Sequence, residues 1–404
     1  MAQNPQLPFS LPPPEGGRPD VLIVAGEHSG DEHAARLVQG LLADRPALRV
    51  CALGGPQLAA AGAQLLHDLT ASSVVGFVEV LRNVRFFRNL FRATLRWIDQ
   101  HRPRAVCCVD YPGFNLRLAR ALHAQGLTTK GGGRIRALYY ISPQIWAWKA
   151  GRRFEMARHL DAMAVIFPFE VTSYADTALP VEFVGHPFVA ADHESPVRHD
   201  AAGPVLLLPG SRRQAVARIF PALLAGYAEC AARHPDRAAI VLHPSDEIKA
   251  VLEQLRARAS PEIAARVELR RTGVPVAAAA VLTSSGTMSM HCALAGIPGA
   301  IAYRTNPLTY LFARWLVRVP HIGIANLLLE EPMYPEFIQG AATAANLARE
   351  LAAALEDPVR RARTQAQARQ LRAVLHQPVT GTAADWLARQ LAQSDGGRSG
   401  EGRG

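Results

Sequence analysis

The feature that most constrains the fold is a strand–loop–helix pattern that occurs twice, about 180 positions apart. Residues 22–31 (LIVAGEHSGD) and residues 206–212 (LLLPGSR) each place a run of aliphatic residues before a loop of small residues. A helix that starts after such a loop directs backbone N–H groups and its positive end at one point, which suits a phosphate or another anion. Neither stretch matches a dinucleotide-binding fingerprint or a P-loop. Two copies, each opening a half of similar size, predict two nucleotide-binding-type domains that face a cleft.

Apolar runs alternate with helical patterns along most of the chain, which predicts the α/β class with parallel sheets and right-handed crossovers. The strands expected in the first half lie near 21–25, 49–53, 105–110, 136–142, 162–167 and 181–184. Those expected in the second half lie near 204–208, 238–242, 266–270, 279–283 and 299–303. In such folds the ligand binds at the carboxyl ends of the strands.

Local composition suggests where the domains begin and end. Residues 1–18 are rich in Pro and residues 393–404 in Gly, Ser and Arg, so both ends are expected to be disordered. A polar stretch between 190 and 204 is typical of a linker. We therefore expect Rossmann-like domains at 19–195 and 202–360, with helices at 361–392 that pack back across them.

The overall composition is that of a globular protein of two domains: the chain has 404 residues, of which 49% are apolar and 19% charged. The first 18 residues lack the basic and apolar regions of a signal peptide, and no run of 18 uncharged apolar residues occurs. Five cysteines without zinc-ligand spacing are interpreted as reduced core residues. The sequence therefore predicts a cytoplasmic protein without a membrane span.

Asp110 follows the apolar run 105–109 and precedes a Pro-Gly turn. A carboxylate at the carboxyl end of a strand faces the expected ligand site, where it is suited to act as a general base toward an attacking hydroxyl. The alternative is a helix-capping or turn aspartate, which the local sequence alone favours about two to one.

The first loop carries Gly26, Glu27, Ser29, Gly30 and Asp31. Acidic residues repel a phosphate, so this loop is interpreted as one that shapes an acceptor pocket or binds hydroxyl groups. Helix capping is at least as good an explanation for Ser29 and for Asp31, each taken alone.

The second half offers two helix starts that suit phosphate oxygens. Arg212 follows the Gly210-Ser211 turn, where a guanidinium adds to the helix dipole and fits a diphosphate, although a surface arginine is an equally good explanation. Ser285-Gly286-Thr287 follows the run 279–283, and His291 lies one turn further along the same helix. A lone His on a helix is usually structural, and no metal site is predicted.

Residues 80–98 form an amphipathic pattern with apolar and aromatic residues on one half of the helical wheel and five arginines on the other. The pattern fits a core helix with a solvated basic face and, equally, a helix that lies on an anionic bilayer. Nucleic acid binding is weaker, because no recognition module is present. The residues assigned to the membrane surface are Val84, Arg85, Phe87, Arg88, Phe91 and Arg92.

Several motifs occur in an order that resembles the lipid A disaccharide synthase family, bacterial glycosyltransferases of the GT-B fold. They are AGEHSGD at 25–31, VGFVEVL at 75–81, YISPQIWAW at 140–148, PFE at 168–170, GHP at 185–187, LPGSR at 208–212 and SGT at 285–287. Shorter matches are YR at 303–304, PLT at 307–309 and NLL at 326–328. The resemblance covers about residues 19–390.

The resemblance implies an inverting, metal-independent and cofactor-independent transfer. The 2,3-diacylglucosamine unit of its UDP derivative passes to 2,3-diacylglucosamine 1-phosphate, giving a β-1,6-linked disaccharide and UDP. Asp110 matches the proposed catalytic aspartate, and Glu27 of the first loop is also retained. Arg212, the Ser285-Gly286-Thr287 helix start and Asn326 match positions on the side that binds UDP. The first domain would then bind the acceptor and acyl chains, and the enzyme would work at the cytoplasmic face of the inner membrane.

Two positions depart from the family pattern, both on the donor side. His291 stands where the family usually carries a Glu that binds the ribose, and Ala215 replaces the acid of Gly-Ser-Arg-x-x-Glu. These departures keep two alternatives open, a UDP-sugar 2-epimerase-like enzyme and a degenerate UDP- or lipid-binding paralogue. Acyl-chain length and oligomeric state stay open as well.

Overall fold

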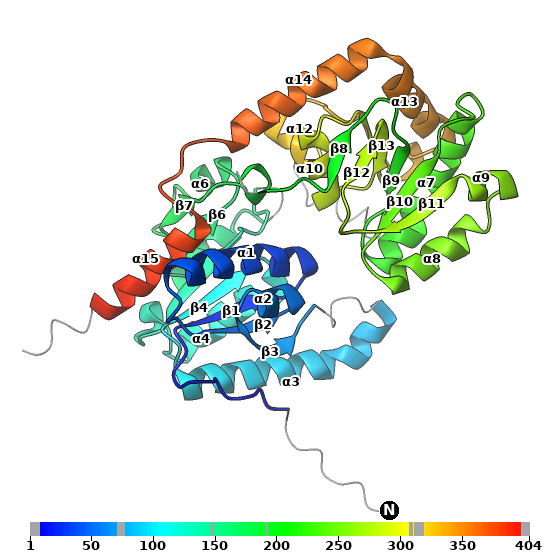
Figure 1. Cartoon of the computed structure of the whole chain (residues 1–404). Coiled ribbons are helices and arrows are strands. Elements are labelled where there is room, and N and C mark those ends of the chain that lie inside the picture. The colour runs from blue at the N-terminus through cyan, green and yellow to red at the C-terminus, as the bar shows by residue number, and fades with distance from the viewer. Residues whose placement is uncertain are drawn as a thin grey trace, which may run out of the picture. The chain divides into compact units, whose positions relative to one another are not determined.

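The computed structural model describes residues 9–70, 77–146, 149–190, 193–306, 310 and 319–396, with side chains omitted at 77–84 and 394–396. The chain divides into two compact units (Figure 1). Unit 1 comprises Met1–Pro187 together with Pro378–Gly404, and unit 2 comprises Phe188–Gln377. The C-terminal segment thus belongs to the same unit as the N-terminal half of the chain.

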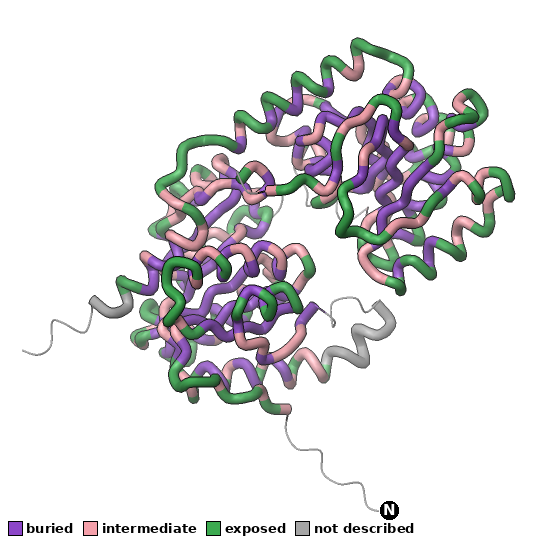
Figure 2. The backbone as a smooth tube through the Cα atoms, viewed as in Figure 1, coloured by how far each residue is buried: buried purple, intermediate pink, exposed green. Residues whose placement is uncertain are grey.

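Unit 1 is built on a parallel sheet of seven strands in the order β3-β2-β1-β4-β5-β6-β7. The strands are β1 Val21–Ala25, β2 Val50–Gly54, β3 Gln64–Asp68, β4 Ala105–Val109, β5 Arg136–Tyr140, β6 Ala162–Val165 and β7 Val181–Phe183. The helices are α1 His28–Asp44, α2 Pro56–Ala60, α3 Phe77–His101, α4 Pro112–Ala124, α5 Arg152–His159, α6 Phe169–Thr172 and α15 Ala383–Gly396. Every residue of β1, β2, β4 and β6 is buried, because helices cover both faces of a parallel sheet (Figure 2).

Unit 2 contains a parallel sheet of six strands in the order β11-β10-β9-β13-β14-β15 and a smaller pair, β8 with β12. The strands are β8 Val197–His199, β9 Val205–Leu208, β10 Ala239–His243, β11 Val267–Arg271, β12 Val276–Ala278, β13 Ala280–Thr283, β14 Gly299–Tyr303 and β15 Glu336–Ile338. The helices are α7 Arg213–Ala231, α8 Asp246–Arg256, α9 Pro261–Ala265, α10 Thr287–Leu294, α12 Ile324–Leu329, α13 Ala344–Glu356 and α14 Pro358–Leu375.

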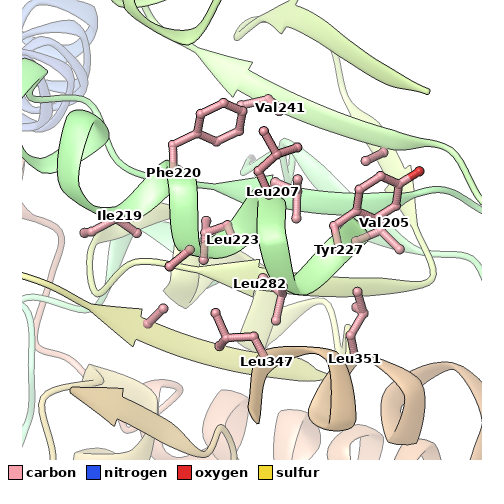
Figure 3. Packing of buried hydrophobic residues seen from close by; sticks show 14 of the residues in the cluster. Val205, Leu207, Ile219, Phe220, Leu223, Tyr227, Val241, Leu282, Leu347 and Leu351 are labelled. Atoms are coloured by element: carbon pink, nitrogen blue, oxygen red, sulfur yellow. The ribbon is translucent and has the colours of Figure 1, made fainter. Parts of the chain in front are cut away.

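The core of unit 2 lies where α7 packs against the sheet and against α13 (Figure 3). Phe220, Leu223 and Tyr227 of α7 are at most 1% exposed, and Leu347 and Leu351 of α13 are fully buried. Fully burying one large apolar side chain contributes about 1.5–3 kcal/mol, so this contact fixes α7 and the loop that precedes it.

Both large sheets reverse their strand order at one place. In unit 1, β1 lies between β2 and β4. Strands β2 and β3 extend the sheet on one side of β1, and strands β4 to β7 extend it on the other. In unit 2, β9 occupies the same position between β10 and β13. Crevices at the carboxyl ends of such strand pairs are the usual ligand sites of open α/β sheets. The two loops singled out in the sequence follow β1 and β9.

The expected disorder of residues 1–18 is wrong for residues 9–18, which form an ordered strap against unit 1. Trp97 Nε1 donates to the carbonyl of Pro12 at 2.8 Å, and Arg49 donates to the carbonyls of Gly16 and Arg18 at 2.7 and 2.8 Å. The Phe9 ring packs edge-on against His67 and Phe86. The proline-rich local sequence does not predict this ordered segment, because the residues that contact it lie far along the chain.

The C-terminal helices divide between the units. Helix α14 contacts α10 and α12 of unit 2, whereas α15 contacts α1, β5 and β6 of unit 1. Trp386 and Leu387 of α15 are at most 1% exposed, and Arg104 donates to the carbonyl of Leu391 at 2.8 Å. Helix α15 is therefore an integral part of unit 1.

Candidate functional site

Asp110 lies at the carboxyl end of β4, next to β1, where the strand order of unit 1 reverses. Asp110 and Tyr111 have φ angles of 45° and 49°, a left-handed conformation that is uncommon for residues other than glycine. Helix α4 begins directly afterwards, with Tyr111 at its N-cap and Pro112 in its first turn. The N-cap position suggested as an alternative for Asp110 is thus occupied by Tyr111.

Three hydrogen bonds hold the backbone of Asp110 in this conformation. Its N–H donates to the carbonyl of Tyr140 at 3.0 Å. Its carbonyl accepts from Asn115 Nδ2 at 2.8 Å and from Tyr139 Oη at 2.7 Å. Asn115, which is fully buried, also donates to the carbonyls of Val24 and Val109. These contacts fix the backbone from which the Asp110 side chain projects. Residues held in such uncommon backbone conformations are frequent at functional sites, where the fixed geometry pre-organises the reacting groups.

The loop after β1 is shaped by the ring of Tyr111. A Cβ atom on Gly26 would lie 2.2 Å from Cδ1 of Tyr111, so only glycine leaves room for this ring. Burial, with a smaller contribution from the Glu27 carboxylate, raises the pKa of Tyr111. Glu27 is half-buried at the N-cap of α1, where its side chain makes no capping bond. The structure thus brings Gly26, Glu27 and the Asp110–Tyr111 turn together.

The interpretation of Asp31 as a residue of the acceptor pocket needs correction. Asp31 is 1% exposed, and its carboxylate accepts from the N–H groups of Gly55, Gln57 and Leu58 at 2.7, 3.0 and 3.3 Å. It therefore caps the N-terminus of α2, the structural alternative that the sequence had left open. Ser29 is half-buried and Gly30 is buried in the first turn of α1.

Sequence reasoning gave no role to Glu170, although its PFE motif was noted. This residue of α6 is 1% exposed, and its oxygens accept from Trp146 Nε1 at 3.4 Å and from the N–H of Phe167 at 3.3 Å. Burial raises the pKa of Glu170 to about 8, the hydrogen bonds oppose that rise, and the charge of Asp110 adds to it. Glu170 is therefore within electrostatic reach of the candidate base.

In unit 2, the loops after β9 and β13 lie against each other. The N–H of Ser284 donates to the carbonyl of Leu208 at 2.7 Å, and a Cβ atom on Gly210 would lie 3.3 Å from Ser284 Oγ. Gly210 has a φ of 107°, which requires glycine and lets the chain turn directly into α7. The starts of α7 and α10 are therefore neighbours, an arrangement that suits a diphosphate.

Part of each of these two loops is open to solvent. Ser211, Arg212, Gly286 and Thr287 are all exposed. Ser285 instead donates its hydroxyl to the carbonyl of Ile322 at 2.8 Å, so it braces the loop. The exposed members are the ones able to contact a diphosphate.

Asn326, expected on the donor side, is fully buried and used within unit 2. Its Nδ2 donates to the carbonyl of Tyr334 and to Glu336 Oε1, at 2.7 and 2.8 Å. Its Oδ1 accepts from the N–H groups of Met333 and Tyr334, at 2.9 and 3.0 Å. This bonding corrects the expectation of a direct donor contact, because both ends of the amide already hold the start of β15 against α12.

His291 also differs from its expected contact with the donor ribose. It is 5% exposed, and its ring stacks on Phe188 with a centroid distance of 3.9 Å and on His193 at 5.2 Å. Phe188 and His193 come from the segment that opens unit 2. The ring therefore anchors that segment on α10.

The basic helix α3 contributes its apolar face to the core over the part whose side chains are described. Leu90 and Ile98 are fully buried, and the Phe91 ring packs edge-on against Phe114 of α4 at 5.4 Å. Phe91 is half-buried, so its ring is partly used in packing within unit 1, and its membrane role stays a prediction. Phe87 is half-buried, Arg85, Arg88 and Arg92 are exposed, and Val84 lies outside the described side chains.

Among the described residues, no cluster of three or more His, Cys, Asp or Glu side chains is arranged to hold a metal ion. Over the same residues, no helix combines the length and hydropathy needed to cross a bilayer.

Comparison with solved structures supports the fold. A UDP-GlcNAc 2-epimerase from Neisseria meningitidis superposes with a TM-score of 0.57 over 92% of this chain and 99% of its own, at 12% identity. The calicheamicin glycosyltransferase CalG4 gives 0.53 over 93% and 99%, at 16% identity. At these identities the likeness concerns the fold, which is the α/β GT-B fold.

Sequence comparison is more specific. The family model for LpxB, lipid-A-disaccharide synthetase, matches residues 21–391. A lipid-A-disaccharide synthase of Geobacter sulfurreducens is 37% identical over 86% of this chain and 90% of its own length. Lipid-A-disaccharide synthase 1 of Legionella pneumophila is 37% identical over 84% and 88%. This chain belongs to the lipid-A-disaccharide synthase family of glycosyltransferases.

Proposed function

We propose that the chain transfers 2,3-diacylglucosamine from its UDP derivative to 2,3-diacylglucosamine 1-phosphate, forming the β-1,6-linked disaccharide 1-phosphate and UDP. Family membership over residues 21–391 supports the reaction class. The observation that carries the assignment of the site is the fixed left-handed turn at Asp110, which follows the central strand pair of unit 1.

In this reaction Asp110 acts as the general base. The 6-hydroxyl oxygen of the acceptor attacks the anomeric carbon of the donor, the bond from that carbon to the diphosphate breaks, and the hydroxyl proton passes to the Asp110 carboxylate. The hydrogen bonds from Asn115 and Tyr139 to the backbone carbonyl of Asp110 hold the turn that carries this side chain while the acceptor binds. Glu27, half-buried beside Tyr111, is proposed to bind an acceptor hydroxyl group.

The loops of unit 2 are proposed to stabilise the departing UDP. The N-termini of α7 and α10 direct backbone N–H groups toward the diphosphate, and the exposed Arg212 guanidinium adds a positive charge there. Charge that develops on the leaving group is stabilised by such fixed donors.

An assay of UDP release with both lipid substrates tests the base assignment. Asp110→Asn is expected to lower kcat about 10²- to 10⁴-fold, the usual contribution of a general base, while UDP binding stays unchanged. Asp44→Asn, at an exposed position of α1, is the matched control and should keep full activity. Near-normal turnover by Asp110→Asn would remove Asp110 from the role of base.

We also propose that unit 1 docks on an anionic membrane surface, which places the enzyme at the cytoplasmic face of the inner membrane. Arg85, Arg88 and Arg92 are exposed along α3. Each basic residue near an anionic surface contributes about 1 kcal/mol, so reversing all three to Glu should weaken vesicle binding at least about 100-fold.

Sedimentation with vesicles that contain anionic phospholipid measures this change. The matched control reverses Arg233, Arg258 and Arg369, three exposed arginines of unit 2. Equal sedimentation of both triple variants would contradict the assignment of α3 to the membrane.

A further inference from the structure

Glu170 differs from the other buried carboxylate described above in the hydrogen bonds that it receives. Asp31 accepts three backbone N–H groups, the shortest bond being 2.7 Å. Glu170 is equally buried, and the bonds that it accepts from Phe167 and Trp146 are longer, at 3.3 and 3.4 Å. Among the residues that the structure describes, none forms an ion pair with Glu170. An ionised carboxylate in such surroundings is costly, which favours the uncharged acid.

The groups that face Glu170 do not offset this cost. Asp110, at the end of β4, is negative and opposes a second negative charge. Tyr174, which follows α6, is 2% exposed, and burial raises its pKa so that it stays neutral. His186, after β7, is 4% exposed, and its ring is tilted by 40° against that of Phe167, whose N–H group bonds Glu170. The geometry and the charges therefore agree that Glu170 is protonated near neutral pH.

The segment held by Glu170 borders the candidate base. Residues 141–146 follow β5 directly, and the last residue of β5, Tyr140, accepts the N–H of Asp110. Ile141 has a φ of 68°, which is strained for a β-branched residue. Such strain persists only where the surroundings hold the chain in place.

Two contacts provide that support. Ser142 Oγ and Tyr174 Oη are 2.7 Å apart, at the start of the segment. At its end, the half-buried Trp146 ring is edge-on to Phe169 of α6 at 5.3 Å and donates to Glu170. Phe169 and Glu170 of α6 thus support the end of the segment, and Tyr174, just after α6, supports its start.

We propose that Glu170, as an uncharged acid, is a positioning residue for glycosyl transfer: it keeps Trp146 and the strained 141–146 segment in place beside Asp110, and loss of its proton disrupts that arrangement. The inference rests on the proposed function, since it assigns Asp110 as the base. An ionised Glu170 would place a second negative charge near Asp110 and would draw solvent toward the buried face of α6.

The first test is the pH profile of kcat/KM for UDP release. For the unaltered protein we expect kcat/KM to fall above about pH 8, about tenfold per pH unit. Glu170→Gln, which resembles the protonated acid at every pH, should retain activity near pH 7 and lose this alkaline decline. Glu155→Gln, at an exposed position of α5, should keep the profile of the unaltered protein. An alkaline decline that persists in Glu170→Gln would overturn the proposal.

The second test needs no substrate and therefore separates this inference from the proposed function. Tryptophan fluorescence of the unaltered protein is expected to change between about pH 7 and pH 9, with the midpoint at the pKa of Glu170. The change should disappear in Trp146→Phe, which keeps an aromatic ring but removes the donor to Glu170, and in Glu170→Gln. A fluorescence titration without this transition would refute the role of Glu170. Should the transition occur in a protein that transfers no sugar, the proposed function would fail instead.

Discussion

Glu170→Gln is expected to stabilise unit 1, and the gain is expected to grow with pH. In the folded chain Glu170 has its pKa raised from 4.5 to about 8, with burial as the largest cause. The unfolded chain therefore loses this proton at a lower pH than the folded chain. Stability due to the protonated acid is complete below about pH 4.5 and is lost as the pH rises toward 8. A glutamine side chain does not titrate, so the variant escapes this loss.

The size of the effect follows from the shift. Each pH unit between the two pKa values changes the free energy of unfolding by about 1.4 kcal/mol. From pH 4.5 to pH 7 the difference between the variant and the unaltered protein should grow by about 3 kcal/mol, and it should level off near 5 kcal/mol above pH 8. Other titrating groups are the same in both proteins, so they cancel when the two are compared at one pH.

Urea unfolding followed by tryptophan fluorescence measures this difference, because four of the five tryptophans belong to unit 1. The unfolding midpoints of both proteins are compared at several pH values between 5 and 9. A difference that stays constant over this range would refute the protonated state of Glu170. A difference that falls with pH would show that the folded chain lowers the pKa of Glu170.

Two further substitutions test how unit 1 is held together, both by urea unfolding. Asp31→Ala leaves the N–H groups of Gly55, Gln57 and Leu58 without their acceptor. We therefore expect the free energy of unfolding to fall by about 3 kcal/mol. An unchanged urea midpoint would favour the original interpretation of Asp31 as a residue of the acceptor pocket. Trp386→Ala leaves a cavity at a side chain that is only 1% exposed, so the free energy of unfolding should fall by about 3–5 kcal/mol. Because α15 contacts α1, amide hydrogen exchange in α1 should become faster. Unaltered exchange in α1 would contradict the close packing of α15.

The central strands were predictable from sequence because each is a short aliphatic run followed by a turn. β3 was missed, since Gln64–Asp68 is only partly buried and has polar residues at both ends. β15 was missed for a similar reason, because Glu336–Ile338 is a short edge strand whose first residue is charged. Edge strands bury too little to leave a clear apolar pattern.

Local pattern also located the loops of the site but not the roles of single side chains. Asp110 and the Gly210 turn follow strands, and a strand can be read from neighbouring residues. The role of Asn326 depends on Glu336 and Tyr334, and that of His291 on a segment about a hundred residues earlier. Glu170 was passed over because its burial results from the packing of α6. Such contacts form only when distant parts of the chain meet.

The return of α15 to unit 1 has a consequence for the order of synthesis. Unit 1 is discontinuous, and the 190 residues of unit 2, Phe188–Gln377, are made between its two parts. At about 5–20 residues per second the ribosome needs roughly 10–40 s to make them. During that time the surfaces of α1 and β5 that later cover Trp386 and Leu387 lack their partner. The first unit to emerge is therefore the last to be completed, and a nascent chain truncated before α15 exposes apolar surface that chaperones would recognise.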